Sequence, residues 1–247
     1  MNLSALLVAR NEEKKIEKTL KSLNFVDEIV VILDRSTDKT YQICKNYKAK
    51  IFKGSWPCEG ERRNYGIKKC SKDWILEIDA DEVITKSLAT EIKSKIKNSN
   101  YDFFYLPLLN YICREPVKFG WMACLAPDGK FCLFRKKNKK WKKGFVHPDY
   151  NLIGNKGASL KNEIHHFMSN SITELIERFN RNSSLYSNEL KKDNRKIKKL
   201  FSVRKVFSRF IKSYVSRKGY KNGDLGILIS ILIAIYPFIS ASKSIQD

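Results

Sequence analysis

Short apolar runs alternate with helix-like segments over the first hundred residues. Residues 3–8 form an apolar run, and Ile16, Leu20 and Leu23 then recur at helical spacing. Further strands are expected at residues 28–33, 51–52 and 74–78, separated by helical segments near residues 38–44 and 61–69. Strands that alternate with helices predict an α/β fold with an open, mainly parallel sheet and helices on both faces.

The pattern changes near residue 101. Aromatic and β-rich pieces continue to about residue 170, and apolar positions at helical spacing over 172–190 predict an amphipathic helix. The expected organisation is an α/β half over residues 1–100, a mixed half of the same domain over 101–170, and a helical tail over 171–247.

Composition narrows the class of protein. With 247 residues and 43% hydrophobic side chains, the chain is long and apolar enough to fold around a core. Lys and Arg number 48 against 26 Asp and Glu, and the net charge of +22 predicts attraction to nucleic acid, nucleotide phosphates or an anionic membrane. The six cysteines form no CxxC pair and no export signal precedes the first strand, so we expect reduced thiols in the cytoplasm.

Polar side chains follow three of the expected strands. Asn11 comes after the first, Asp34 after the second, and Asp79 and Asp81 after the fourth. In an open parallel sheet, ligands collect at the carboxyl ends of the strands. A lone Asp-x-Asp is more often an ordinary turn, but with two further clusters it favours a hard divalent cation shared with the diphosphate of a nucleotide-sugar.

These residues resemble the family 2 glycosyltransferases of the GT-A fold, in particular the branch of lipopolysaccharide core β-glucosyltransferases. The matching segments cover nearly the whole chain: LLVARNEEKKIEKTLKSL, DEIVVILDRSTDKT, GERRNYGI, DWILEIDADE, FGW, APDGKFCLFRKK, GFVHPDYNLIG, EIHHF and KGYKNGDLGILIS. The resemblance implies a GT-A-like sheet and inverting sugar transfer from a nucleoside-diphosphate-sugar, with UDP favoured. It also implies a lipid-linked or lipopolysaccharide-type acceptor and a bound Mg²⁺ or Mn²⁺.

The resemblance also implies roles for single residues. Contacts to the nucleotide-sugar are expected from Asn11, Glu13, Asp34, Arg63, Asn64 and Asp79. Asp81 and His166 are expected to bind the metal. Arg35 stands where the family usually has a small or acidic residue, so the base specificity stays open.

A catalytic base is expected on the acceptor side. Where this branch commonly has Val-His-Glu, the chain reads Val146-His147-Pro148-Asp149, so the nearest carboxylate is displaced by one position. Inverting transfer needs a carboxylate within hydrogen-bond reach of the acceptor hydroxyl. Asp149 is the first candidate and Asp128 the second, although either can be a turn residue. Trp121 in this region is a candidate for stacking on a sugar.

Two basic stretches remain. Residues 135–143 are either a solvated loop or a site for a phosphate-rich acceptor. Residues 191–221 hold 13 Lys and Arg against one acid, and residues 225–242 form an uncharged run of 18 with Pro237 interrupting its end. Such a run covers about 27 Å as a helix, short of the ~30 Å hydrocarbon core. We expect the tail to bind the inner face of the cytoplasmic membrane peripherally; a helix packed on the domain is the alternative.

Two other function classes are compatible with part of the pattern. A nucleotidyltransferase would share the α/β sheet and the metal carboxylates, but it would release pyrophosphate. A nucleic-acid-binding protein would account for the net charge of +22 but not for acids at successive strand ends. No nucleic-acid partner is therefore expected.

Overall fold

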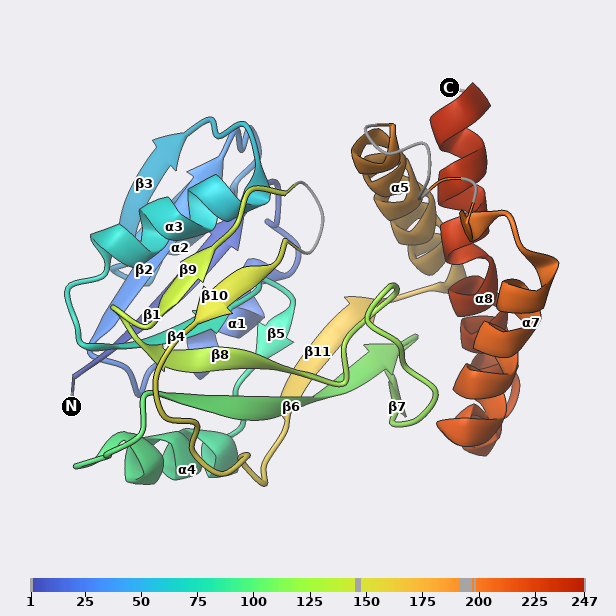
Figure 1. The fold of residues 1–247 in the computed structure, drawn as a ribbon. Helices are drawn as coiled ribbons and strands as arrows, with labels where there is room; N and C mark the ends of the chain where they lie inside the picture. Colours follow the sequence, from blue (N-terminus) through green and yellow to red (C-terminus); the bar gives the residue numbers. More distant parts are fainter. Residues whose placement is uncertain (1, 145–147, 192–196, 198, 247) are drawn as a thin grey trace. The chain divides into compact units, whose positions relative to one another are not determined.

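The computed structural model describes residues 2–144, 148–191, 197 and 199–246 (Figure 1). The strands are β1 (Leu3–Ala9), β2 (Glu28–Asp34), β3 (Lys50–Gly54), β4 (Trp74–Ile78), β5 (Glu82–Val83), β6 (Phe103–Ile112), β7 (Glu115–Val117), β8 (Gly129–Arg135), β9 (Lys139–Trp141), β10 (Tyr150–Leu152) and β11 (Ile164–Ser169). The helices are α1 (Ile16–Ser22), α2 (Thr40–Asn46), α3 (Glu59–Lys69), α4 (Lys86–Ile96), α5 (Ile172–Leu190), α7 (Val203–Ile211) and α8 (Gly223–Gln246), with short helical turns η1 (Lys212–Ser216) and η2 (Gly219–Asn222).

The chain divides into two compact units. Unit 1 comprises residues 1–108 and 129–166, and unit 2 comprises residues 109–128 and 167–247. The strand order is β3-β2-β1-β4-β8-β6-β11-β5, with β7 beside β6. The strands from β3 to β4 run parallel, and β8 continues the sheet antiparallel to β4. The predicted α/β class with an open sheet is confirmed.

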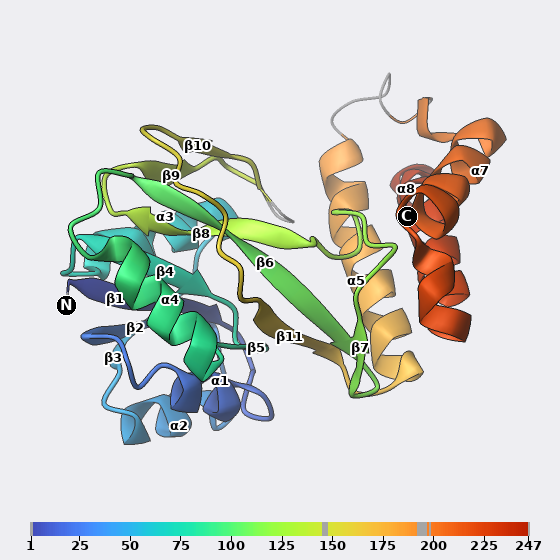
Figure 2. The same ribbon diagram turned by 90° about the horizontal axis from the view of Figure 1, so that it is seen from below.

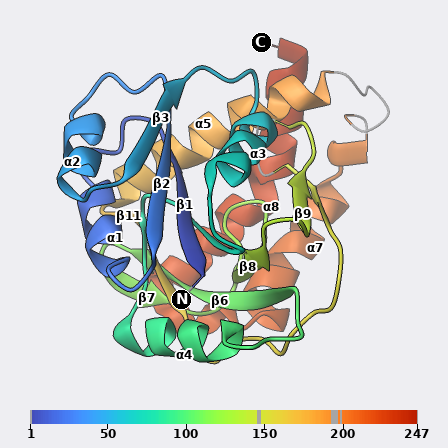
Figure 3. The ribbon, with the colours of Figure 1, turned by 90° about the vertical axis from the view of Figure 1, so that its left-hand side faces the viewer.

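Helices cover both faces of the parallel strands because alternate side chains of each strand point to opposite faces. Leu3 and Leu7 of β1 belong to the core cluster that includes α1 and α4. Leu6, between them, packs in the second cluster with Ile67 of α3. Figure 3 shows α1 and α2 on one side of these strands and α3 on the other. The carboxyl ends of the strands are thereby left to the connecting loops.

Unit 2 is built around α8. This helix packs along α5 and α7, and Ile229 and Ile233 share a core cluster with Phe179 of α5 (Figure 2). Trp121 lies in the same cluster, 2% exposed, and its indole nitrogen donates to the carbonyl oxygen of Val117 at 2.7 Å. Trp121 is therefore a core residue and not a surface on which a sugar could stack.

Helix α8 is longer than the uncharged run suggested. It continues through Pro237 to Gln246, and its 24 residues rise about 36 Å, enough to cross a ~30 Å hydrocarbon core. The expectation that Pro237 interrupts the helix is wrong. By length and composition alone, residues 219–246 could span a membrane. However, 56% of their most apolar 18-residue segment is buried within the structure. That burial is typical of a core helix.

Candidate functional site

The loops that follow β1 and β2 are tied together by side chains predicted to meet the donor. The side-chain oxygen of Asn11 accepts a hydrogen bond from the Thr37 amide at 2.8 Å. The carboxylate of Glu13 accepts from the Lys39 amide at 3.0 Å. Asn11 has a positive φ of 55°, a left-handed conformation that asparagine tolerates better than most residues. Both residues therefore shape the loop beside Asp34, and their donor contacts stay predictions.

Asp34 ends β2 and is enclosed by cations. Its side chain is 4% exposed, and the Arg35 and Arg62 guanidinium groups approach its oxygens to 2.9 Å and 3.1 Å. Burial opposes ionisation of Asp34, but hydrogen bonding and charge from Arg35, with the charge of Arg62, lower its pKa. The carboxylate is thus charged and covered. The contact of Asp34 with a nucleoside base stays a prediction.

Arg63 connects helix α3 to the end of β4. Its guanidinium pairs with Glu59 at 2.6 Å, one turn earlier in the helix, and with Glu77 and Asp79 at 3.0 Å each. Its side chain is only 13% exposed. The predicted donor residues Arg63 and Asp79 are thereby brought into direct contact, and their contacts with the donor stay predictions.

Asn64 holds a strand in place. Its amide nitrogen donates to the Trp141 carbonyl oxygen at 2.9 Å, and its amide oxygen accepts from the Trp141 amide at 3.0 Å. This reciprocal pair fastens α3 to β9. The expected contact of Asn64 with base or phosphate stays a prediction, and the structure gives this side chain a positioning role.

The turn after β4 joins Asp79 to Glu82. The Glu82 amide donates to the Asp79 carbonyl oxygen at 3.1 Å, and the Asp79 amide donates to the Glu82 carboxylate at 3.0 Å. Lys130 of β8 reaches both carboxylates, at 3.1 Å from Asp79 and 2.6 Å from Glu82. Burial opposes ionisation of Asp79, but the charges of Lys130 and Arg63 lower its pKa well below its usual value. Burial raises the pKa of Glu82 despite Lys130.

Asp81 lies beside His166, and the metal-binding role that the resemblance implies for both residues stays a prediction. Strands β5 and β11 are antiparallel with His166 opposite Glu82, and this register brings the imidazole to the turn. The Asp81 Oδ2 and His166 Nε2 atoms lie 3.4 Å apart, with side chains 13% and 7% exposed. A carboxylate oxygen and an imidazole nitrogen are both common metal ligands.

Two lysines of the site have ion pairs that the sequence did not predict, although Lys139 belongs to the basic stretch 135–143. Lys130 is described above; Lys139 of β9 pairs with Glu77 at 2.8 Å, with both side chains at most 3% exposed. Burial lowers the pKa of Lys139, although the Glu77 charge opposes the shift. The available signal was Glu77 itself, since a carboxylate inside the apolar strand WILEI requires a buried cation.

The two candidate bases lie in different units. Asp149, in unit 1, is 86% exposed and lies 3.9 Å from the Lys142 ammonium. The neighbouring Val146 and His147 lie outside the described residues. Asp128, in unit 2, is 62% exposed and pairs with Arg217 at 3.2 Å. Both roles stay predictions.

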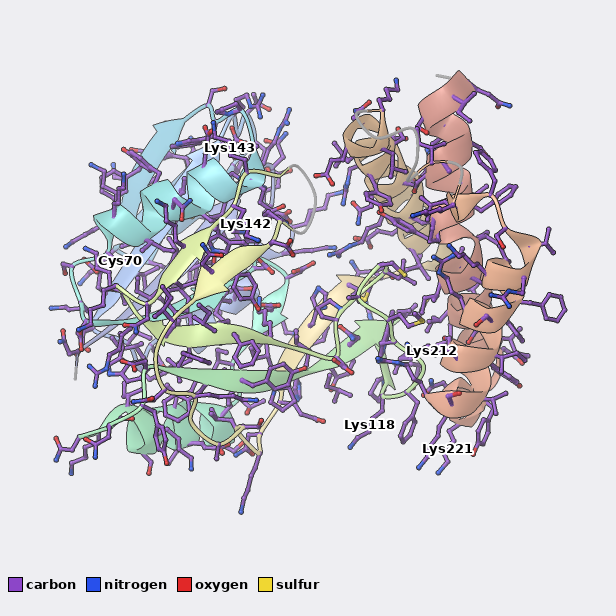
Figure 4. All side chains as sticks on the ribbon, in the orientation of Figure 1. Cys70, Lys118, Lys142, Lys143, Lys212 and Lys221 are labelled. Atoms are coloured by element: carbon purple, nitrogen blue, oxygen red, sulfur yellow. The ribbon has the colours of Figure 1, made fainter. Side chains whose placement is uncertain are left out.

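The basic stretch 135–143 is partly structural. Arg135 pairs with Asp73, Lys136 donates to the Cys70 carbonyl oxygen at 2.6 Å, and Lys139 is buried. Lys140, Lys142 and Lys143 line a surface pocket, whose full lining is Gly60, Glu61, Asn64, Lys140, Trp141, Lys142, Lys143 and Asn151. Figure 4 labels Lys142 and Lys143 beside α3. A phosphate-rich acceptor at this pocket stays a prediction.

Comparison with known proteins identifies the family of the chain. The model of glycosyl transferase family 2 matches residues 4–156. A Rickettsia typhi protein named as an uncharacterized glycosyltransferase is 27% identical, covering 98% of this chain and 86% of its own. The lipopolysaccharide core biosynthesis glycosyltransferase LpsC of Rhizobium meliloti is 23% identical, covering 99% of this chain and 92% of its own.

A solved structure shares the fold. The crystal structure of S. aureus TarS 1–349 covers 100% of this chain and 88% of its own, with a TM-score of 0.51 and 16% identity. The same TarS segment, solved in complex with UDP, also gives a TM-score of 0.51, at 15% identity. At this identity the likeness shows the fold alone, which is the GT-A-like architecture implied by the sequence.

Proposed function

The chain belongs to glycosyl transferase family 2, and we propose that it transfers a sugar with inversion from a nucleoside-diphosphate-sugar, UDP-linked by preference, to a lipid-linked or lipopolysaccharide-core acceptor. The observation that carries the proposal is the set of carboxylates at the ends of parallel strands: Asp34 at the end of β2, and Asp79 and Asp81 after β4. The similarity to LpsC over 92% of that protein supports the acceptor class, and the UDP complex of TarS supports the donor.

Asp81, in the turn after β4, and His166, on β11, fit a divalent cation. Two ligands at right angles around Mg²⁺ or Mn²⁺ are about 3 Å apart, and the Asp81 and His166 donor atoms are separated by 3.4 Å. Within the described part of the chain, no group of three His, Cys, Asp or Glu gathers for an ion. Diphosphate oxygens and water would complete the coordination, as is common for Mg²⁺. When bound, the ion would neutralise charge on the departing diphosphate.

The chain's own cations prepare the site for an anionic donor. Lys130 and Arg63 flank Asp79 at 3.1 Å and 3.0 Å, so the carboxylate remains ionised without repelling a diphosphate. A fixed arrangement of charges in a partly buried site needs no reorganisation when the leaving group develops charge. Asn64 and Lys139 position β9 and β4 and so keep this arrangement rigid.

Comparing two isosteric variants tests which carboxylate removes the proton from the acceptor hydroxyl. Asp149→Asn is expected to leave donor affinity near wild type and to slow transfer severely, while Asp128→Asn keeps transfer. An active Asp149→Asn variant beside an inactive Asp128→Asn variant would move the base to Asp128. If both variants stay active, another carboxylate takes the proton.

Product analysis tests the proposed reaction. The full-length chain would be incubated with nucleotide-sugars, Mn²⁺ and lipopolysaccharide-core acceptors truncated at successive sugars. Release of nucleoside diphosphate with a sugar of inverted anomeric configuration on the acceptor is the expected result. Release of pyrophosphate would instead show a nucleotidyltransferase, the second class compatible with the sequence. An acceptor of this kind would also place the enzyme at the cytoplasmic face of the membrane, which remains part of the proposal.

A further inference from the structure

Helix α7 and the turn η1 carry an exposed apolar stripe on the surface of unit 2. Four large side chains recur every four residues with exposed fractions of 75%, 69%, 46% and 52%: Val203, Phe207, Ile211 and Val215. Phe207 is a phenyl ring with more than two thirds of its surface in water. A contiguous exposed apolar face on a helix commonly marks an interaction site.

The stripe is not a stretch of core left open by loose packing. Ser213, on the other side of η1, is fully buried, and its hydroxyl contacts the Gly120 carbonyl oxygen at 2.6 Å and the Ser230 hydroxyl at 3.0 Å. Arg217, just beyond η1, donates to the Trp121 carbonyl oxygen at 2.6 Å. The inner face of this segment is therefore fixed against the core of unit 2, and the outer face is left apolar.

Basic side chains border the stripe. Arg204 and Lys212, on α7 and η1, are both exposed. Figure 4 shows Lys118, Lys212 and Lys221 on the same part of unit 2, and the Lys221 ammonium lies 5.5 Å from the centre of the Phe119 ring. An apolar helix face with a basic border matches the interface of an anionic bilayer. A second copy of the chain would instead bring two basic borders together, and like charges oppose that contact.

We propose that the α7–η1 stripe, and not α8, is the surface by which this chain inserts into an anionic membrane. One apolar face of α8, which includes Ile229 and Ile233, is fully buried in unit 2, and its outer residues Ile227 and Ile231, at 41% and 43%, are less exposed than Val203 and Phe207 of the stripe. The stripe supplies the apolar contact, and Arg204 and Lys212 supply the attraction to anionic headgroups. This inference goes beyond sugar transfer and holds whatever the acceptor is.

Flotation of the full-length chain with vesicles tests the stripe. Vesicles of phosphatidylcholine with 30 mol% phosphatidylglycerol would be compared with pure phosphatidylcholine. The double variant Phe207→Ser/Ile211→Ser is expected to bind the anionic vesicles about a hundredfold more weakly, since each buried apolar side chain contributes about tenfold. The matched control is Ile153→Ser in unit 1, which removes a side chain that is 72% exposed and should leave binding unchanged.

The charged border is tested separately. Arg204→Gln and Lys212→Gln are each expected to weaken binding about fivefold at low salt, and Lys45→Gln with Lys97→Gln, exposed lysines of unit 1, serve as controls. High salt should remove the difference between these variants and wild type, because screening acts on the charges and not on the apolar contact. Circular dichroism would confirm that each variant is folded.

Three results would overturn the inference. Wild-type protein that ignores anionic vesicles at low salt would exclude the membrane. Undiminished binding by Phe207→Ser/Ile211→Ser would assign the membrane contact to another surface. A wild-type dimer that this double variant converts to a monomer, without vesicle binding in either state, would identify a second copy as the occupant. None of these readouts requires sugar transfer, so they are independent of the proposed function.

Discussion

The two units of this chain use positive charge in different ways. In unit 1, buried cations form ion pairs with buried carboxylates. Lys139 pairs with Glu77 at 2.8 Å, and Lys130 pairs with both Asp79 and Glu82. In unit 2, Arg204 and Lys212 stand exposed beside an apolar stripe. The cations behind the net charge of +22 therefore serve different purposes in the two units. One set of them pairs with buried carboxylates in the candidate site, and another set is exposed beside the apolar stripe.

The largest expected effect is on catalysis. Asp81→Ala should lower the transfer rate by at least about 10³-fold, roughly 4 kcal/mol in the barrier, because it would remove a ligand of the proposed metal ion. Its matched control is Asp73→Ala, which changes an acid at the opposite end of β4 and should keep most activity. Vesicle binding by Asp81→Ala should equal that of wild type. A rate above a tenth of wild type would contradict the metal role.

The next largest effect is on stability, where we compare the replacement of a buried lysine with that of an exposed one. Lys139→Met should lower the free energy of unfolding by about 3 kcal/mol, because the Glu77 carboxylate would keep only one of its two cationic partners in a buried setting. Lys212→Met on the surface of unit 2 should change it by no more than about 0.5 kcal/mol. Urea unfolding of both variants measures the contrast. Equal costs would show that the two units do not differ in this way.

A smaller effect is expected on how the stability of unit 1 depends on pH. Glu28 is 7% exposed, and although burial opposes its ionisation, hydrogen bonds from Lys50, Ser4 and Ser71 lower its pKa to about 2. A lowered pKa stabilises the fold above the unfolded value near 4.5, and this contribution is lost as the pH falls toward 2. Glu28→Gln should therefore cost about 2 kcal/mol at pH 7 and little at pH 2. Thermal unfolding of Glu28→Gln and wild type between pH 7 and pH 2 checks this prediction. A stability difference between the two proteins that does not change with pH would contradict it.

The smallest expected effect is on donor affinity. Asp34→Asn should weaken nucleotide-sugar binding about tenfold, roughly 1.4 kcal/mol, through loss of the charge behind the base. Arg35→Gly uncovers this carboxylate and relieves a positive φ of 54°, so it should bind the donor at least as tightly as wild type. Calorimetric titration separates the two variants. Unchanged affinity in Asp34→Asn would show that the base contact is wrongly assigned.

Much of unit 1 could be predicted because the evidence is local. Strands β1, β2 and β4 are short apolar runs, Asp34 ends β2, and Asp79 and Asp81 lie in the turn after β4, so parallel pairing carries them to one edge. The resemblance supplied His166, and the β5–β11 register then accounts for its contact with Asp81.

The missed residues depend on long-range pairing. Lys130 reaches Asp79 only because β8 continues the sheet beside β4, and nothing in the local sequence specifies that neighbour. The uncharged run at residues 225–242 is equally ambiguous, since a buried core helix and a membrane helix can share one composition. Burial within unit 2 distinguishes them only after α5 and α7 are packed against α8.

The central claim is that the turn after β4 binds a nucleotide-sugar together with a divalent cation. Calorimetry on the full-length chain, with a panel of UDP-sugars in the presence and absence of Mn²⁺, tests this directly. Wild-type protein is expected to bind one donor at least about tenfold more tightly with Mn²⁺, and Asp81→Asn should lose that increment while Asp73→Asn keeps it. A donor affinity that Mn²⁺ does not change, or an increment that survives in Asp81→Asn, would contradict the account.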